Sequence, residues 1–168
     1  MENQMATQMQ TQRTQHRRQA ATPTSSLRLR DVMTPNPQYI TPDCTLQEAA
    51  KLMDDLNVGT LPVCVDGQLR GMVTDRDITC RCIAVGKDPQ TRIVDAMSER
   101  PLWCRDDDTI DDALAKMAER QIRRVPVIDK DDRLVGIVSL GDIATKSGDI
   151  AKAGDTLTEV SNPSEPDR

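Results

Sequence analysis

The chain has almost no aromatic residues and a single histidine. Its 168 residues include no Phe, one Trp and one Tyr. A core built from this supply must be aliphatic, which suits small βα units better than an aromatic-rich β-sandwich. The one histidine, His16, lies in a polar N-terminal stretch. Because the sequence also lacks the GxSxG, HExxH and Walker motifs, we expect no catalytic residues and no enzyme activity.

Long apolar runs and a disulfide framework are also missing. No run approaches the roughly 18 apolar residues that a membrane span needs, and no charged-then-apolar signal segment opens the chain. The five cysteines are odd in number and follow no framework spacing. We therefore expect a soluble, cytoplasmic protein with reduced thiols and no membrane partner.

The net charge of −5 is unevenly distributed. Residues 1–30 carry five Arg against Glu2, which is 5 − 1 = +4, so the remainder carries −5 − 4 = −9. An acidic body argues against a nucleic-acid-binding surface, although a basic N-terminal arm leaves a nucleic-acid-associated role open. Residues 1–27, rich in Gln, Thr, Arg and Ser, are predicted to be disordered. Residues 148–168 are predicted to form a C-terminal tail.

Between these ends the sequence contains an internal repeat. The segment DVMT at 31–34 recurs as DAMS at 95–98, an offset of 95 − 31 = 64. The same offset relates 45–49 to 109–113 and 61–63 to 125–127, and an offset of 65 relates GMVTDRDI at 71–78 to GIVSLGDI at 136–143. The chain therefore holds two copies of one supersecondary unit.

Each copy shows the same order of predicted elements. A short extended piece leads to a helix-capping pair, Thr45 with Glu48 or Thr109 with Asp112. The helix that follows carries an apolar stripe. Two β-rich runs joined by a turn come next, and a second helix begins after Thr74 or Ser139. The stripes are Leu46, Ala49, Ala50 and Met53 in the first copy, and Ile110, Ala113, Leu114 and Met117 in the second.

This β-α-β-β-α order and its motifs resemble the CBS domain, and the tandem pair resembles a Bateman module. The shared marks are D-h-M-T/S, T-h-x-E/D-A, h-P-V and G-h-h-T/S-x-x-D, where h is apolar, and each occurs twice. The resemblance implies an α/β fold in which repeats at 28–86 and 87–147 pack about a pseudo-twofold axis. Stand-alone bacterial pairs similar to this one are linked to hypoxia or stress responses.

The repeated hydroxyl and acid at the end of each copy are the main candidate site residues. A strand that ends at Thr74 and passes straight into a helix presents free N–H groups to an anion, and the carboxylate of Asp77 can accept hydrogen bonds from ribose hydroxyls. Ser139 and Asp142 repeat the pattern. The resemblance implies phosphate and ribose contacts at these positions. The same T-x-x-D spacing is also a capping box, so a purely structural role stays open.

Two arginines distinguish the second copy. Arg123 and Arg124 precede its h-P-V strand and can bind phosphate through bidentate hydrogen bonds, or they can be a solvated pair beside the strand. The first copy has Gly59 and Thr60 there. We therefore expect two unequal sites. With so few aromatic residues, adenine would lie among aliphatic side chains and backbone amides.

No metal site is predicted. Cys80 and Cys82 lack a second pair of ligands at zinc spacing, so we expect ordinary packing or an inert thiol. The acid-rich run at 106–112 lacks the glycine and terminal Glu of an EF-hand loop, so capping and surface charge explain it.

The resemblance implies a non-enzymatic regulatory module that senses AMP, ADP or ATP in clefts between the repeats. No effector domain is present, so the signal would pass to an unknown partner protein, and such modules usually form homodimers. The other readings are a structural or protein-interaction module without ligand, and a nucleic-acid-associated protein acting through the basic arm.

Overall fold

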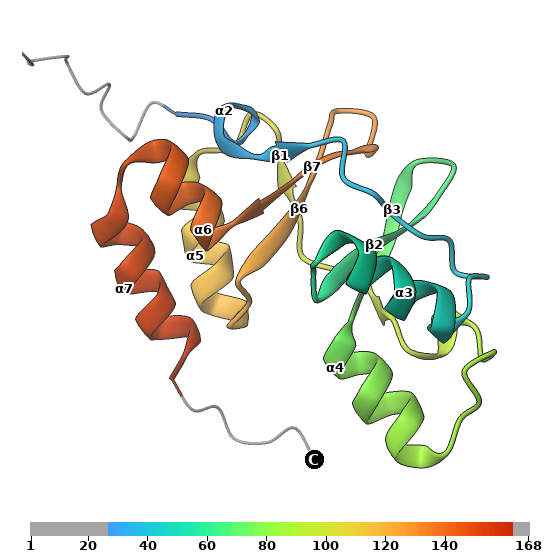
Figure 1. Ribbon diagram of the computed structural model, residues 1–168. Coiled ribbons are helices and arrows are strands. Elements are labelled where there is room, and N and C mark those ends of the chain that lie inside the picture. The colour runs from blue at the N-terminus through green and yellow to red at the C-terminus, as the bar shows by residue number, and fades with distance from the viewer. Residues whose placement is uncertain (1–26, 163–168) are drawn as a thin grey trace, which may run out of the picture.

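Two helix-and-strand units lie side by side in the computed structural model, which describes residues 27–162 (Figure 1). Each unit has a long first helix, an antiparallel strand pair and a short second helix, as the sequence predicts, so the α/β fold class is confirmed. The first unit contains α3 (Leu46–Leu56), β2 (Thr60–Val65), β3 (Gln68–Thr74) and α4 (Asp75–Asp77); the second contains α5 (Ile110–Arg120), β6 (Arg124–Ile128), β7 (Leu134–Ser139) and α6 (Leu140–Asp142).

The second helix of each unit continues beyond its first turn in a wider form. In the first unit, α4 runs into the π-helical turn η2 (Ile78–Cys82) and the 3₁₀ turn η3 (Ile83–Val85). In the second unit, α6 runs into the π-helical turn η5 (Ile143–Ser147). A further 3₁₀ turn, η4 (Ile93–Asp95), lies between the units in sequence.

The two long helices begin at the predicted capping pairs. The Thr45 hydroxyl accepts a hydrogen bond from the Glu48 N–H at 3.2 Å, and the Glu48 carboxylate accepts from the Thr45 N–H at 2.7 Å. Thr109 and Asp112 repeat the arrangement at the start of α5. Free N–H groups are thereby satisfied at both starts.

The sheet of each unit contains an edge strand that comes from the other repeat. The strand β1 (Thr34–Pro35) pairs with β7, and the equivalent β4 (Ser98–Glu99) pairs with β3. The second sheet therefore has the order β1-β7-β6-β5, where β5 (Cys104–Arg105) runs parallel to β6, and the first has the order β2-β3-β4. We call residues 29–35 and 93–99 the lead-in segments, because each lies at the start of its own repeat in sequence but joins the sheet of the other.

The hydrophobic cores are exchanged in the same way. Leu29 and Val32, from the short helix α2 (Leu29–Val32), are fully buried in the core of the second unit. The equivalent Ile93 and Ala96 are fully buried in the core of the first unit. The predicted boundary between residues 86 and 87 separates the two repeats in sequence. Each hydrophobic core nevertheless contains residues from both sides of that boundary.

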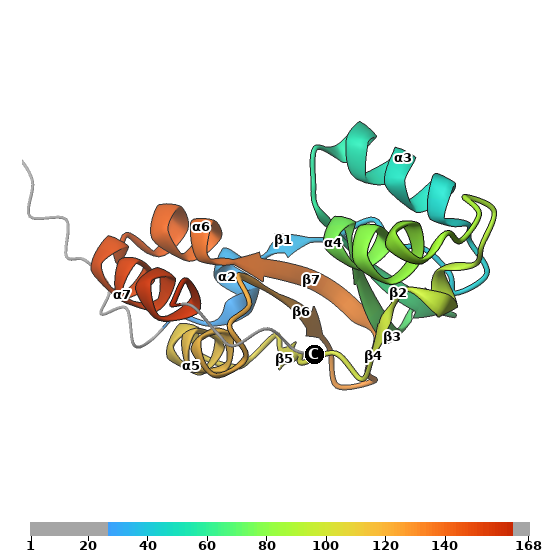
Figure 2. The same ribbon diagram turned by 90° about the horizontal axis from the view of Figure 1, so that it is seen from below.

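The turns of the two strand pairs meet between the units (Figure 2). The Leu134 N–H donates to the carbonyl oxygen of Gly67 at 3.0 Å, and Gln68 forms a β-bridge with Arg133. Gly67 has a φ of +79°, and a Cβ there would lie 2.6 Å from the Arg133 guanidinium. The backbone conformation favours glycine at this turn, whereas the arginine end could move aside to admit a side chain.

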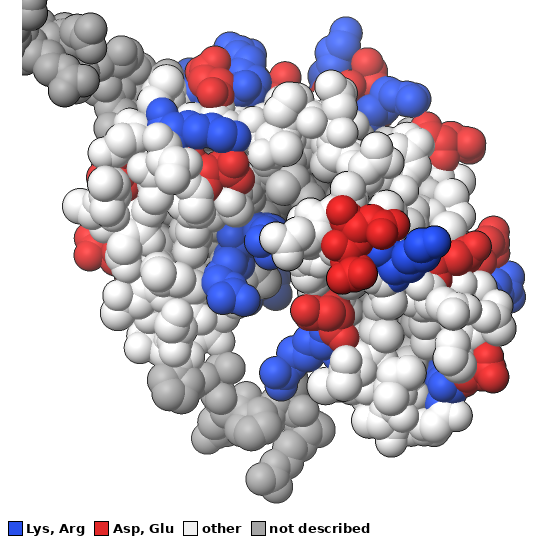
Figure 3. Space-filling view, viewed as in Figure 1, with Lys and Arg blue, Asp and Glu red and all other residues white. Residues whose placement is uncertain are grey.

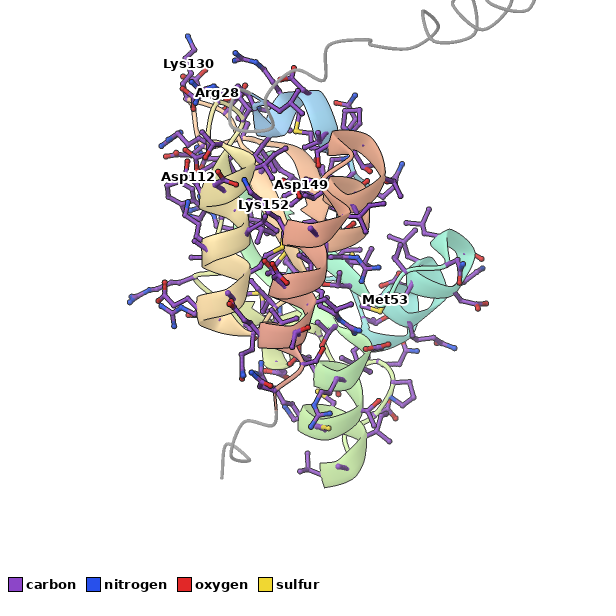
Figure 4. All side chains as sticks on the ribbon, turned by 90° about the vertical axis from the view of Figure 1, so that its left-hand side faces the viewer. Arg28, Met53, Asp112, Lys130, Asp149 and Lys152 are labelled. Carbon is purple, nitrogen blue, oxygen red and sulfur yellow. The ribbon has the colours of Figure 1, made fainter. Side chains whose placement is uncertain are left out.

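The prediction of a tail at 148–168 is wrong for residues 150–160. They form the helix α7 (Ile150–Val160), which the Asp149 carboxylate caps by accepting from the Lys152 N–H at 3.1 Å. The helix packs beside α5 (Figure 4) and buries Ala153 and Thr156. Small buried side chains explain why the apolar pattern was weak. The disorder prediction for residues 1–26, and the end of the predicted tail at 163–168, fall outside the described residues.

One predicted core position differs between the repeats. Ala50 lies on the predicted apolar stripe of α3 but is exposed, whereas its counterpart Leu114 on α5 is buried. The reason is that α7 covers α5, and nothing in the described chain covers α3 in the same way. Across residues 27–162, no helix has both the length and the apolar character needed to cross a membrane.

Candidate functional site

At both strand-to-helix corners the predicted hydroxyl and acid are in direct contact. The Thr74 hydroxyl accepts a hydrogen bond from the Asp77 N–H at 3.0 Å. In return, Asp77 Oδ2 accepts from the Thr74 N–H at 2.9 Å and from its hydroxyl at 2.7 Å. Ser139 and Asp142 form the same reciprocal pair. The capping box is therefore present at both corners, and it occupies Oδ2 of each acid.

The other carboxylate oxygen, Oδ1, faces groups that the sequence reasoning missed. Asp142 Oδ1 lies 2.8 Å from the Lys146 ammonium and accepts from the Thr34 hydroxyl at 3.3 Å. Because Thr34 belongs to the lead-in strand of the first repeat, both repeats build this corner. Lys146 and Thr34 each have a counterpart at the repeat offset, Arg81 and Ser98. An alignment of the two copies could therefore have identified them.

The first corner has the equivalent set. Asp77 Oδ1 lies 3.5 Å from the Arg81 guanidinium, which also donates to the Ser98 hydroxyl at 3.0 Å. Arg81 corresponds to Lys146, and Ser98 corresponds to Thr34 in the other lead-in strand. Each corner therefore combines an acid, a base one helical turn later, and a hydroxyl from the opposite repeat.

The acid of the second corner is held in its charged form. Its side chain is 17% exposed. Burial by itself would raise the pKa of Asp142, but hydrogen bonds from Lys146 and Ser139 outweigh burial, and the pKa lies below its ordinary value. A partly buried carboxylate that stays ionised is a strong acceptor for hydroxyl donors.

This lowered pKa predicts an acid-sensitive contribution to stability. A carboxyl whose pKa is lower in the folded state stabilises the protein above its unfolded pKa, and that stability is lost as the pH falls through the folded pKa. As the pH is lowered from about 6 to about 3, the melting temperature of Asp142→Asn should therefore fall less than that of the wild type. Thermal unfolding of both proteins at matched ionic strength measures the difference. Parallel curves would show that Asp142 does not contribute.

The two predicted arginines lie next to the second corner. Arg124 on β6 is the cross-strand partner of Ser139 on β7, and the carbonyl of Arg123 accepts from the Leu140 N–H at 3.1 Å. Both side chains are exposed, and within residues 27–162 neither forms an ion pair. Positive side chains border the recess between the units (Figure 3). The second corner therefore offers two uncommitted cations beside a hydroxyl.

The first corner has the opposite charge. Gly59 and Thr60 take the places of the two arginines, and the carboxylate of Asp75 lies against Gly59, 2.9 Å from where a Cβ would be. The Asp75 N–H donates to the Gly59 carbonyl at 3.1 Å. The charges of the corners thus differ in the direction that the sequence predicts.

The remaining candidates form no further site. Burial raises the pKa of both Cys64 and Cys104 to about 11, so these thiols are unreactive. In the part of the chain that the structure describes, no three His, Cys, Asp or Glu side chains are placed to hold a metal ion. Trp103 is 40% exposed, and its ring lies 5.2 Å from the Arg105 guanidinium carbon. Trp103 therefore lies at the surface and not in either core.

Comparisons with known proteins agree with this architecture. The family model described as CBS domain matches residues 29–81 and 93–149. The CBS domain-containing protein YhcV of Bacillus subtilis is 42% identical over 134 residues, which cover 80% of this chain and 95% of that protein. The crystal structure of Hypoxic Response Protein I with two coordinated zinc ions is 38% identical, with a TM-score of 0.66 over 70% of this chain and 97% of that one.

A third comparison is a ligand complex. The crystal structure of CBSX2 in complex with AMP is 29% identical to this chain and has a TM-score of 0.67. The match covers 75% of this chain and 99% of that one.

Proposed function

The chain belongs to the CBS domain family, and on that premise we propose that it is a non-enzymatic regulatory module that binds an adenine nucleotide, AMP, ADP or ATP, between its two repeats. Binding at a site built from both repeats shifts their relative position and thereby changes a surface that a partner protein reads. The module works as a homodimer in the cytoplasm. Sedimentation velocity at two protein concentrations tests the dimer.

The second corner carries this proposal. Arg123 and Arg124 supply cations for a phosphate, and the Ser139 hydroxyl lies across the strand pair from Arg124. Asp142, the capping partner of Ser139, keeps its Oδ1 outside the capping box, and this oxygen can accept from a ribose hydroxyl. Phosphate donors and a sugar acceptor at adjacent positions match a nucleotide better than a simple anion.

The ribose would replace an existing contact. Asp142 Oδ1 holds Lys146 at 2.8 Å and Thr34 at the longer distance of 3.3 Å. We therefore assign the exchange to the weaker Thr34 contact, which frees the hydroxyl of Thr34 to bind the ligand. Since Thr34 belongs to the opposite repeat, this step links binding to the arrangement of the two repeats. The AMP complex of CBSX2 supports an adenine nucleotide as the ligand class.

Thermal unfolding with AMP, ADP, ATP, S-adenosylmethionine and GTP tests the proposal. At a ligand concentration of about a hundred times Kd, stabilisation should reach about 2.7 kcal/mol, a shift of roughly 5–10 °C for a protein of this size. Adenosine compounds should give the shift and GTP should not. Asp142→Ala should abolish it, while Asp77→Ala, the matched change at the acidic first corner, should leave most of it.

The arginines provide a second control. Arg123→Ala or Arg124→Ala should weaken nucleotide affinity about 10- to 100-fold, because each removes a charge-assisted hydrogen bond to phosphate. If no compound shifts the midpoint in the wild type, the corners are caps only, and the protein is a structural or protein-interaction module. Salt-dependent retention of DNA or RNA that is lost on replacing Arg13, Arg17 and Arg18 would instead support the nucleic-acid role.

A further inference from the structure

The chain passes from β4 in the first sheet to β5 in the second (Figure 2), and a pocket lies along this passage. Its volume is about 640 Å³, which is within the range of pockets that hold small molecules. Pro42, Leu69 and Pro101 contribute to its apolar wall, and Trp103 lines it as well. No residue of either corner is among its lining residues. This pocket, which we call the β4 pocket, is therefore separate from both corners.

The indole ring of Trp103 is held in place at the pocket. The Lys116 ammonium donates to the Trp103 carbonyl oxygen at 3.1 Å and lies 5.8 Å from the centre of the ring. The guanidinium carbon of Arg105 lies 5.2 Å from the same centre, and the guanidinium also donates to the Asp132 carboxylate at 3.0 Å. Trp103 is nevertheless 40% exposed. A flat ring that is fixed before binding and still exposed is well suited to stack against another flat ring.

Two exposed arginines, Arg70 and Arg100, bring positive charge to the β4 pocket. Arg70 donates to the Gln68 side chain at 2.9 Å, and within residues 27–162 neither arginine forms an ion pair. The carboxylate of Glu99 also lines the pocket, so the charge of the lining is 2 − 1 = +1. A guanidinium can bind a carboxylate through two parallel hydrogen bonds. The pocket therefore favours a ligand that carries an anionic group beside its ring.

The fold of a repeat does not require these cations. At the repeat offsets, all four cations that lie in the pocket or beside the Trp103 ring are replaced by uncharged residues. The pairs are Arg70 with Val135, Arg100 with Asn36, Arg105 with Thr41, and Lys116 with Leu52. Arg100 has a φ of +52°, a left-handed conformation that asparagine, its counterpart at +49°, adopts more readily than arginine. An arginine that the backbone disfavours and the fold does not need indicates a role in binding.

We propose that the β4 pocket binds a planar aromatic carboxylate. The ring of the ligand stacks against Trp103, and its carboxylate accepts hydrogen bonds from Arg70 and Arg100. This site is additional to the nucleotide cleft of the proposed function and does not depend on it.

Two-dimensional NMR of the isotope-labelled full chain tests this proposal, with cinnamate as the probe. Trp103 is the only tryptophan in the sequence, so the single indole N–H signal reports on this pocket. Cinnamate should shift that signal saturably at low salt. Cinnamyl alcohol and cinnamylammonium, which keep the ring but lack the negative charge, should bind at least about tenfold more weakly.

The arginines test how the carboxylate is bound. Arg70→Ala or Arg100→Ala should weaken cinnamate affinity about tenfold, because each removes a charge-assisted hydrogen bond. Arg120→Ala, at an exposed arginine at the end of α5, is the matched control and should leave the affinity unchanged. An indole signal that does not move, equal affinities for the three probes, or wild-type affinity in both pocket variants would overturn the proposal.

Calorimetric titration extends the test to variants that lack the indole. Trp103→Ala should weaken cinnamate binding about tenfold, and Trp103→Phe, which keeps a flat ring, should retain most of the affinity. Asp142→Ala, which should abolish the nucleotide shift at the second corner, should not alter cinnamate binding. Loss of cinnamate binding in Asp142→Ala would place the probe at that corner and would refute a separate site.

Discussion

Replacing Leu29 by alanine should cost about 2–5 kcal/mol of unfolding free energy and should loosen the second unit, although Leu29 belongs to the first repeat in sequence. The side chain is fully buried in the core of the second unit, together with residues of β6, β7 and α5. Truncation removes apolar contacts and leaves a cavity in that core. Leu56→Ala, at a position 41% exposed, is the control and should cost less than about 1 kcal/mol.

The location of the damage decides whether the cores are exchanged. In Leu29→Ala, hydrogen exchange should rise along β6 and β7, and in Ile93→Ala it should rise along β2 and β3, because Ile93 is buried in the first core. Each variant thus loosens the unit formed mainly by the other repeat. If instead Leu29→Ala loosens β2 and β3, the lead-in segments pack within their own repeats and this architecture is wrong.

Much of the local structure was predictable because its causes are local. The capping pairs, the apolar stripes and the strand pairs each depend on residues within a few positions of one another, and all of them appear twice. Thr45 with Glu48 predicts a helix start, and the Asp66-Gly67 turn sits between two β-rich runs. In the structure both features lie where the pattern predicts.

The exchange of lead-in strands was not predictable in the same way. Strands of two residues, such as Thr34–Pro35 and Ser98–Glu99, carry no alternating pattern that could identify a partner. The repeat offset shows that the two segments are equivalent. Two arrangements agree with that equivalence: each segment could join the sheet of its own repeat, or each could join the sheet of the other repeat. Only the packing of Leu29 and Ile93 in three dimensions distinguishes these arrangements.

The same limit applies to the candidate site. Thr74, Asp77, Ser139 and Asp142 could be found because each pair lies three residues apart. Their partner Thr34 could not, because it reaches Asp142 across 108 positions of sequence. The sequence therefore predicts the corner itself and the cations beside it, but not which other element completes it.

Helix α7 was missed for a different reason and supports the second corner. Its buried positions are Ala153 and Thr156, and a helix with such small contacts has a weak apolar signal. It nevertheless packs against α6, where Leu140 directly follows the site residue Ser139 and is only 7% exposed. Through Leu140, α7 helps to hold the strand-to-helix corner in place.

An aspartate at position 153 should therefore detach α7 and disturb the corner. Ala153 is 5% exposed between α7 and the rest of the second unit, and an unpaired carboxylate there should cost about 3 kcal/mol or more. Ala151→Asp, on the exposed side of the same helix, is the matched control and should change stability by no more than about 0.5 kcal/mol. Thermal unfolding measures both. In Ala153→Asp, hydrogen exchange should also rise at residues 139–142; if it rises only within α7, the helix covers the core without supporting the site.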